Sequence, residues 1–201
     1  MSIYAPQPHQ RHTGLLYRDE QGVFRVVHLA FHFDLRDEEI AGAATCARAS
    51  LSHSNQEIVA AFASQVVRGD PQIKYGVTSD GQCFDSVGNY IEGPIGTGLT
   101  CATFVTAIFR ALQLPILAEE SWPTRSEDKE WFEGIVKFME EKREEYGIDQ
   151  AHIDALKQDP VASRIRPEEV AAGALHADWP NAFQDIEALA QEVLEELGVA
   201  A

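Results

Sequence analysis

The chain has 201 residues, of which 45% are hydrophobic and 24% charged, values typical of a folded globular protein rather than a disordered one. Its formal net charge is −16, which disfavours nucleic acid as a partner because the phosphate backbone is also negative. No apolar run approaches the roughly 20 residues that a membrane-spanning helix needs, and the first residues lack the apolar core of a signal peptide. We therefore expect a cytoplasmic protein without a membrane span.

Cys46, Cys83 and Cys101 are widely separated and show no paired spacing. An odd number of cysteines without a signal peptide indicates reduced thiols. The sequence has no zinc motif and no phosphate-binding, nicotinamide or haem motif, so we expect no metal and no cofactor.

The first predicted element is a β-hairpin formed by residues 13–18 and 23–31, two runs rich in aromatic and β-branched residues. Gly22 suits the left-handed position of a three-residue loop with a bulge. In that register Asp19 faces Val23, and His12 and His28 lie on the same face of the hairpin. The two histidines then become diagonal neighbours, roughly 7–8 Å apart at the backbone.

The middle of the chain alternates predicted helices and strands. We expect a helix in the Ala-rich stretch 37–49, a second helix opened by a capping box at Ser54 and Glu57, and a second hairpin formed by 72–78 and 82–89. An apolar helix should follow over 99–112 and end before Pro115.

The character of the sequence changes after Pro123, where charged amphipathic patterns take over. These patterns predict a long acidic helix over 127–146 and shorter helices over 149–157, from Pro167, and over 182–197. We predict a core formed by residues 1–118 and an acidic helical extension, residues 119–201, packed on that same core.

Cys101 stands where a glycine-rich loop enters the predicted helix 99–112. The N-terminus of a helix lowers the pKa of a thiol and offers backbone N–H groups to an oxyanion, so Cys101 is a candidate nucleophile. The alternative is a small buried side chain without chemistry, which is how we interpret Cys46 and Cys83.

A thiol nucleophile needs a base, and the hairpin register places His12 and His28 together for that role. One ring would take the thiol proton while the other orients it, and His32 is a substitute for either. The alternatives are ordinary strand histidines or a metal site formed by the three histidines, for which no ligand spacing is present.

These segments resemble a known group of enzymes. The His12–Tyr17 stretch followed by Val26, His28 and Leu29 is similar to the histidine strand pair of the circularly permuted NlpC/P60 proteins, which include the lecithin:retinol acyltransferase-like enzymes. The stretch Cys101-Ala-Thr-Phe-Val resembles their nucleophile helix. The PPPDE-type deubiquitinase-like peptidases share the same order, with histidine before cysteine.

The resemblance implies an α+β, permuted papain-like fold, in which a small antiparallel sheet packs on the nucleophile helix. It also implies that Cys101 is the nucleophile, His12 the general base and His28 the third polar residue. Thr100 stands where many relatives have Asn, and the Pro-Gly-Asp strand that commonly precedes the first histidine is missing, which leaves the substrate subclass open.

The function that follows from these assignments is hydrolysis of an amide or peptide bond, with a peptide or peptidoglycan-like substrate. One alternative is a thioesterase or acyltransferase with the same centre. A second alternative is a non-enzymatic module that binds a protein partner through its acidic helices.

Overall fold

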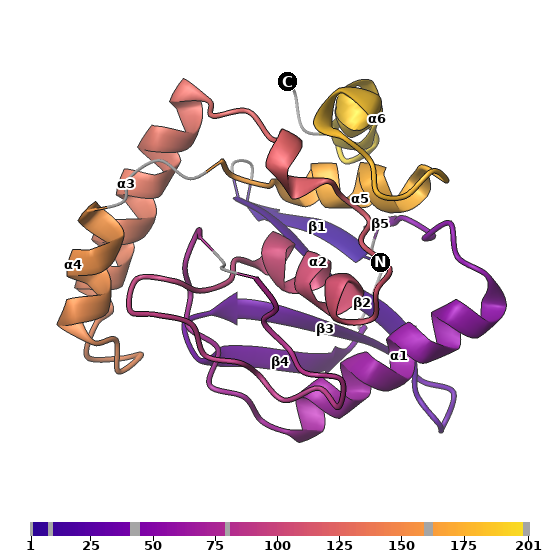
Figure 1. Cartoon of the computed structure of the whole chain (residues 1–201), viewed down its shortest axis with the longest axis horizontal. Helices are drawn as coiled ribbons and strands as arrows, with labels where there is room; N and C mark the ends of the chain where they lie inside the picture. The colour runs from indigo at the N-terminus through magenta and orange to yellow at the C-terminus, as the bar shows by residue number, and fades with distance from the viewer. Residues whose placement is uncertain (1, 8–9, 41–44, 79–80, 159–162, 199–201) are drawn as a thin grey trace.

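The computed structural model describes residues 2–7, 10–40, 45–78, 81–158 and 163–198, and shows an α+β fold (Figure 1). The strands form an antiparallel sheet in the order β4-β3-β2-β1-β5. The strands are β1 (Ser2–Gln7), β2 (Gln10–Arg18), β3 (Phe24–Phe31), β4 (Asp34–Glu39) and β5 (Thr45–Cys46).

The β2–β3 hairpin has the predicted register, with Leu16 opposite Val26. Its turn forms because the Asp19 carboxylate accepts the N–H groups of Gln21 and Val23, at 3.0 and 2.8 Å. Gly22 adopts a φ of 85°, a left-handed conformation that glycine reaches without steric cost. Local turn chemistry therefore sets which face each hairpin side chain occupies.

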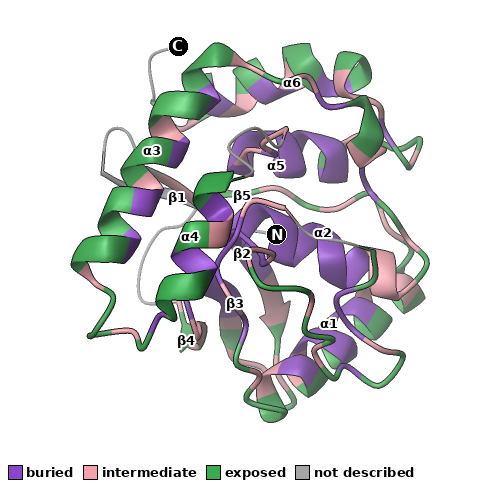
Figure 2. Cartoon of the chain, turned by 60° about the vertical axis from the view of Figure 1, so that its left-hand side comes forward, coloured by how far each residue is buried: buried purple, intermediate pink, exposed green. Residues whose placement is uncertain are grey.

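Helix α2 (Cys101–Ala111) packs on this hairpin and forms the centre of the core. Every residue from Cys101 to Phe109 is buried, and α2 lies across strands β2 and β3 (Figures 1 and 2). Leu15, Val27 and Leu29 face the helix from the sheet and belong to the same apolar cluster. Burial of each such side chain contributes about 1.5–3 kcal/mol, which anchors the start of α2 against the sheet.

The remaining helices surround this centre in two groups. Helix α5 is buried nearly all round and joins the main core together with α6, whereas α3 and α4 pack on each other around a smaller cluster that includes Phe31 and Tyr75 (Figure 2). The bounds are α1 (His53–Arg68), α3 (Ser126–Glu141), α4 (Gln150–Gln158), α5 (Pro167–Leu175) and α6 (Phe183–Glu196). A short 3-10 turn, η1 (Glu119–Ser121), precedes α3. Among the residues that the structure describes, no helix is long and apolar enough to cross a membrane.

Several predicted elements differ from the structure. The predicted helix over 37–49 is wrong: its first residues pair with β3 as part of β4 and two others form β5, while 41–44 lie outside the described residues. The predicted second hairpin is also wrong in its described parts, which form only isolated bridges, Tyr75 with Leu99 and Phe84 with Tyr90. The predicted turn at 79–80 lies outside the described residues. Here tertiary pairing outweighs local propensity.

Two helix ends also differ. Helix α1 is capped by Ser52, whose side chain accepts the N–H of Asn55, rather than by the predicted box at Ser54. Helix α3 ends at Glu141, earlier than the predicted 146, although its buried stripe of Phe132, Val136 and Met139 is amphipathic as expected.

Candidate functional site

His12 and His28 meet directly, as the hairpin register predicts. His12 Nε2 lies 2.7 Å from His28 Nδ1, and the rings are nearly perpendicular, with centroids 4.7 Å apart. Both side chains project from the same face of β2 and β3, because each stands an even number of residues from the paired Leu16 and Val26. This is the face opposite the one that Leu15, Val27 and Leu29 turn to α2, so the two rings point away from the helix that begins with Cys101. The hairpin thus places an imidazole pair at its open end.

Glu38 on β4 extends this pair into a chain of three groups. His28 Nε2 lies 3.3 Å from Glu38 Oε2, and a carboxylate can only accept, so Nε2 of His28 donates. A neutral His28 then accepts at Nδ1, and His12 donates to it from Nε2. The lone pair of a neutral His12 is therefore held on Nδ1, the ring nitrogen nearer its backbone.

Both imidazoles of the pair are neutral at physiological pH. Burial, the neighbouring His28 and the Arg36 charge lower the pKa of His12 to about 3. Burial also lowers the pKa of His28, although Glu38 opposes this effect. His12 is consequently neutral at physiological pH, but a pKa of about 3 makes it a much weaker base than a group that titrates near the working pH.

Cys101 is the first residue of α2, and its position depends on a capping box. Thr100 Oγ1 accepts the N–H of Thr103 at 3.1 Å, and Thr103 Oγ1 accepts the N–H of Thr100 at 2.8 Å. The backbone N–H of Thr13 points to the Cys101 thiol, as do the N–H groups of Cys101 and Ala102. Thr13 is bonded to His12, so the thiol lies beside the backbone that carries the base.

Strand pairing explains why the thiol reaches this position. Strand β2 pairs with β3 only from Leu15 onward, whereas Thr13 pairs on its other side with β1. The start of α2 approaches β2 where the ladder with β3 ends. The described contacts of the Cys101 thiol are with backbone N–H groups, and an imidazole nitrogen is not among them. Catalytic hydrogen bonds often shorten only when substrate binds.

The thiol differs from the sequence expectation in one respect. The helix N-terminus predicts a lowered pKa, but burial raises the pKa of Cys101 above its ordinary value, and the three N–H groups and the Arg164 charge only oppose that rise. The side chain is 9% exposed. In the resting state the Cys101 thiol and the His12 imidazole are therefore both neutral and do not form a preformed ion pair.

Two residues that the sequence analysis missed complete the surroundings of the thiol. Burial, and then the nearby Cys101, raise the pKa of the Tyr75 hydroxyl. Arg164 is largely buried, with its guanidinium carbon 3.6 Å from the centre of the Trp131 ring and Nη1 3.5 Å from Asp128. The 119–201 segment thus contributes a charge near Cys101. Neither residue lies in a sequence motif that would have identified it.

His32 does not join this site. Its Nδ1 accepts the N–H of Tyr75 at 3.2 Å, while His152 donates from Nε2 to the carbonyl of Tyr75 at 2.9 Å and accepts the N–H of Gly96 at Nδ1. Both rings are buried and hold the 73–76 segment between β3 and α4. The role of His32 is therefore structural. The described residues contain no group of three or more His, Cys, Asp or Glu placed to hold a metal ion.

The other two cysteines lie elsewhere. Cys46 is exposed on β5, and Cys83 is buried beside Arg110, with 3.6 Å between Sγ and Nη2. Sequence reasoning also missed Glu38, because the charged run around it was predicted to be helical. The strand sequence DLRDEE shows no regular alternation of apolar and polar residues, so its pattern does not indicate a strand.

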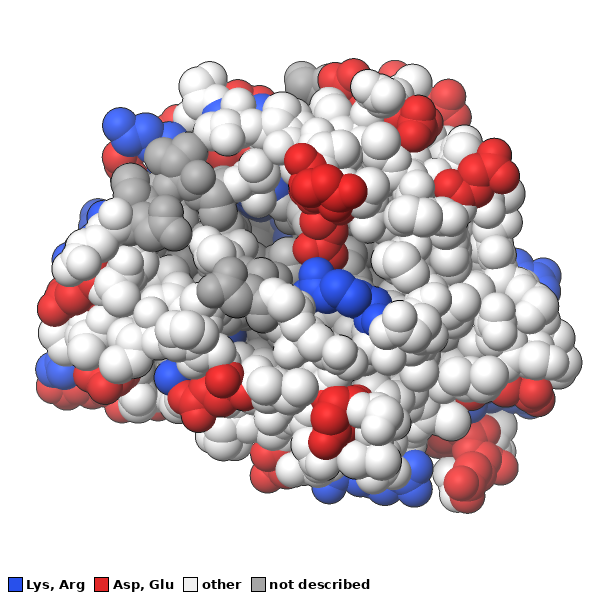
Figure 3. All heavy atoms as spheres, viewed as in Figure 1, with Lys and Arg blue, Asp and Glu red and all other residues white. Residues whose placement is uncertain are grey.

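Acidic groups do not gather into one patch on the face that carries α2. Figure 3 shows Asp, Glu, Lys and Arg mainly around the rim of this face, with an adjoining acidic and basic group near its centre.

Comparison of the chain with protein-family models, with curated proteins and with solved structures finds no significant match.

Proposed function

We propose that this chain is a cysteine hydrolase that cleaves an amide or peptide bond, with Cys101 as nucleophile and His12 as general base. The observation that carries the proposal is the chain from Glu38 through His28 to His12, which holds the His12 lone pair on Nδ1. A hydrogen-bonded partner that orients the base is the arrangement that cysteine and serine hydrolases require.

The proposed reaction follows from the neutral resting state. The proposed step requires the start of β2 to turn the His12 ring towards Cys101 when substrate binds. Nδ1 of His12 then takes the thiol proton, and the sulfur attacks the carbonyl carbon. The backbone N–H groups of Cys101 and Ala102 are placed to stabilise the oxyanion. The protonated imidazole then gives its proton to the leaving amine, and water, deprotonated by the same nitrogen, releases the acid from the acyl-enzyme.

The overall arrangement supports a permuted papain-like fold. An apolar helix that begins with the cysteine packs on an antiparallel hairpin, and the histidines precede the cysteine in the chain. Thr100 occupies the cap position, where its hydroxyl takes part in the capping box that begins α2.

Acyl transfer from p-nitrophenyl acetate tests the proposal without knowledge of the natural substrate. We expect mass spectrometry to locate a transient acetyl group on Cys101. Replacement of His12 by Ala should slow acetylation by about 100-fold or more, and Glu38→Gln by about tenfold, because the second change only loosens control of the tautomer. Cys83→Ala is the matched control, since it removes another buried thiol, and it should leave the rate unchanged.

A non-enzymatic binding module is the second candidate, and the raised pKa of the buried Cys101 favours it. In such a module Cys101 would be acetylated only slowly, at the same rate with or without His12. That result, obtained with variants shown to be folded by circular dichroism, would contradict the hydrolase proposal. If thioesters are cleaved and amides are not, the thioesterase or acyltransferase alternative replaces amide hydrolysis.

A further inference from the structure

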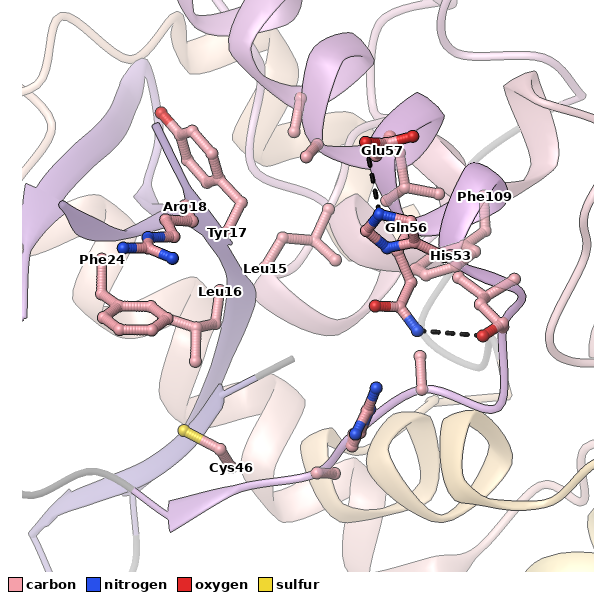
Figure 4. A pocket seen from close by; sticks show the side chains of 17 residues that line it. Leu15, Leu16, Tyr17, Arg18, Phe24, Cys46, His53, Gln56, Glu57 and Phe109 are labelled. Carbon is pink, nitrogen blue, oxygen red and sulfur yellow. Dashed lines mark hydrogen bonds and ion pairs between the residues drawn. The ribbon is translucent and has the colours of Figure 1, made fainter. Parts of the chain in front are cut away.

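A cavity of about 420 Å³ lies away from the thiol, between β2, the β5–α1 connection and α1. Figure 4 shows Leu15 and Leu16 on the strand side of this cavity and His53 and Gln56 on the helix side, with Phe109 of α2 at the back. Its volume falls within the range of about 300–1,000 Å³ that is usual for small-molecule sites.

The walls of the cavity are mainly apolar. Leu15, Val59 and Phe109 are buried and form the inner wall, while Phe24 lies at the rim with 57% of its surface exposed. An exposed aromatic ring beside an apolar cavity is costly in water and is covered when an apolar ligand binds. The remaining apolar lining consists of Leu16, Ala47, Ala49, Leu51, Ala60 and Ala63.

The charged groups of the lining are predominantly positive, in contrast to the net charge of −16 for the whole chain. The carboxylate among the described lining residues, Glu57, already has a partner, because its Oε1 lies 3.5 Å from Nε2 of His53. Arg18 donates from Nε to the carbonyl of Gly22, which does not neutralise its charge. Within the described part of the chain, neither Arg18 nor Arg48 forms an ion pair with a carboxylate.

We propose that this cavity binds a single-chain amphipathic anion, whose alkyl body occupies the apolar interior and whose carboxylate or phosphate head is held by Arg48. Guanidinium groups bind both heads through paired N–H donors. Among the described residues that line the cavity, Glu57 is the only carboxylate, so a cationic amphiphile lacks a comparable partner there. The site does not involve Cys101 or His12, and the inference does not rest on the proposed hydrolase activity.

Calorimetric titration with decanoate, decyl phosphate, decanol and decyltrimethylammonium, each below its micelle concentration, tests the proposal. We expect both anions to bind more tightly than decanol, and the cation to bind most weakly; the ratio between the two anions identifies the preferred head. Arg48→Gln should weaken binding of the anions by about two- to fivefold and leave decanol unchanged. Arg68→Gln, at the exposed end of α1, is the matched control.

The position of the ligand is tested on α1, where Ala60 lines the cavity and its neighbour Ala61 is exposed and does not. Ala60→Phe should abolish binding, and Ala61→Phe should not change it. Bound decanoate should also slow alkylation of Cys46, the exposed thiol of the lining, in a Cys101→Ser background.

Equal affinity for decanol and the anions would overturn the assignment of an anionic head. Unchanged binding in a folded Ala60→Phe variant, or unprotected Cys46 at saturating decanoate, would overturn the location. Because Cys101→Ser removes the proposed nucleophile, binding in that background separates the fate of this site from the fate of the hydrolase proposal.

Discussion

Acidification should destabilise the folded chain through His32. Its ring is 1% exposed and accepts the N–H of Tyr75, and burial, then the nearby His152 and Lys74, lower its pKa from 6.5 to about 4. The pKa of the neighbouring His152 is also lowered by burial, and there the Asp149 charge opposes the decrease. Because the unfolded chain takes up the proton first, the stability that neutral His32 contributes is present above pH 6.5 and is lost as the pH falls towards 4.

The size of the effect follows from the two pKa values. Between pH 7 and pH 5 a histidine that titrates at 6.5 when unfolded and near 4 when folded loses about 2 kcal/mol of folding free energy. His32→Asn removes the titration and retains an acceptor near the Nδ1 position. At pH 7 this variant should be less stable by about 1–2 kcal/mol, because part of the buried ring is lost.

Urea unfolding at pH 7 and pH 5 measures the free energy of unfolding of both proteins. Between pH 7 and pH 5 the wild type should lose about 2 kcal/mol more folding free energy than His32→Asn, so the stability difference between the two proteins should close or reverse. His53→Asn, whose side chain is 86% exposed, is the control and should follow the wild type at both pH values. Equal losses in wild type and His32→Asn would show that His32 is not held neutral by its surroundings.

Three further substitutions test the packing around the site, each by urea unfolding. Gly14→Ala should destabilise the fold by about 1–3 kcal/mol and slow acetylation of the thiol, because a Cβ there would lie 2.8 Å from the carbonyl of Val27 and force the strands apart; normal stability would refute the close approach. Thr103→Val removes half of the capping box and should cost about 1 kcal/mol; no loss would show that the box is dispensable. Asp128→Asn should cost about 3 kcal/mol, because this buried carboxylate lies among three arginines, and a stable variant would mean that solvent already screens them.

Much of the site could be predicted from local sequence. The alternation of side chains along a hairpin, together with the turn at Asp19 and Gly22, sufficed to bring His12 and His28 onto one face. The glycine-rich approach to an apolar run likewise located the start of α2 at Cys101. These features depend on interactions between residues close in the chain, and short-range geometry is what a sequence pattern encodes.

The partners of these groups required the tertiary structure. Glu38 reaches His28 only because a charged segment that favours helix is taken up as a strand beside β3. Tyr75 and Arg164 approach Cys101 from distant parts of the chain. The direction of the thiol's pKa shift was likewise decided there, since the sequence indicates the helix dipole that lowers it but not the burial that outweighs it. Burial is the sum of packing from every neighbouring element, so it exists only once those elements have assembled.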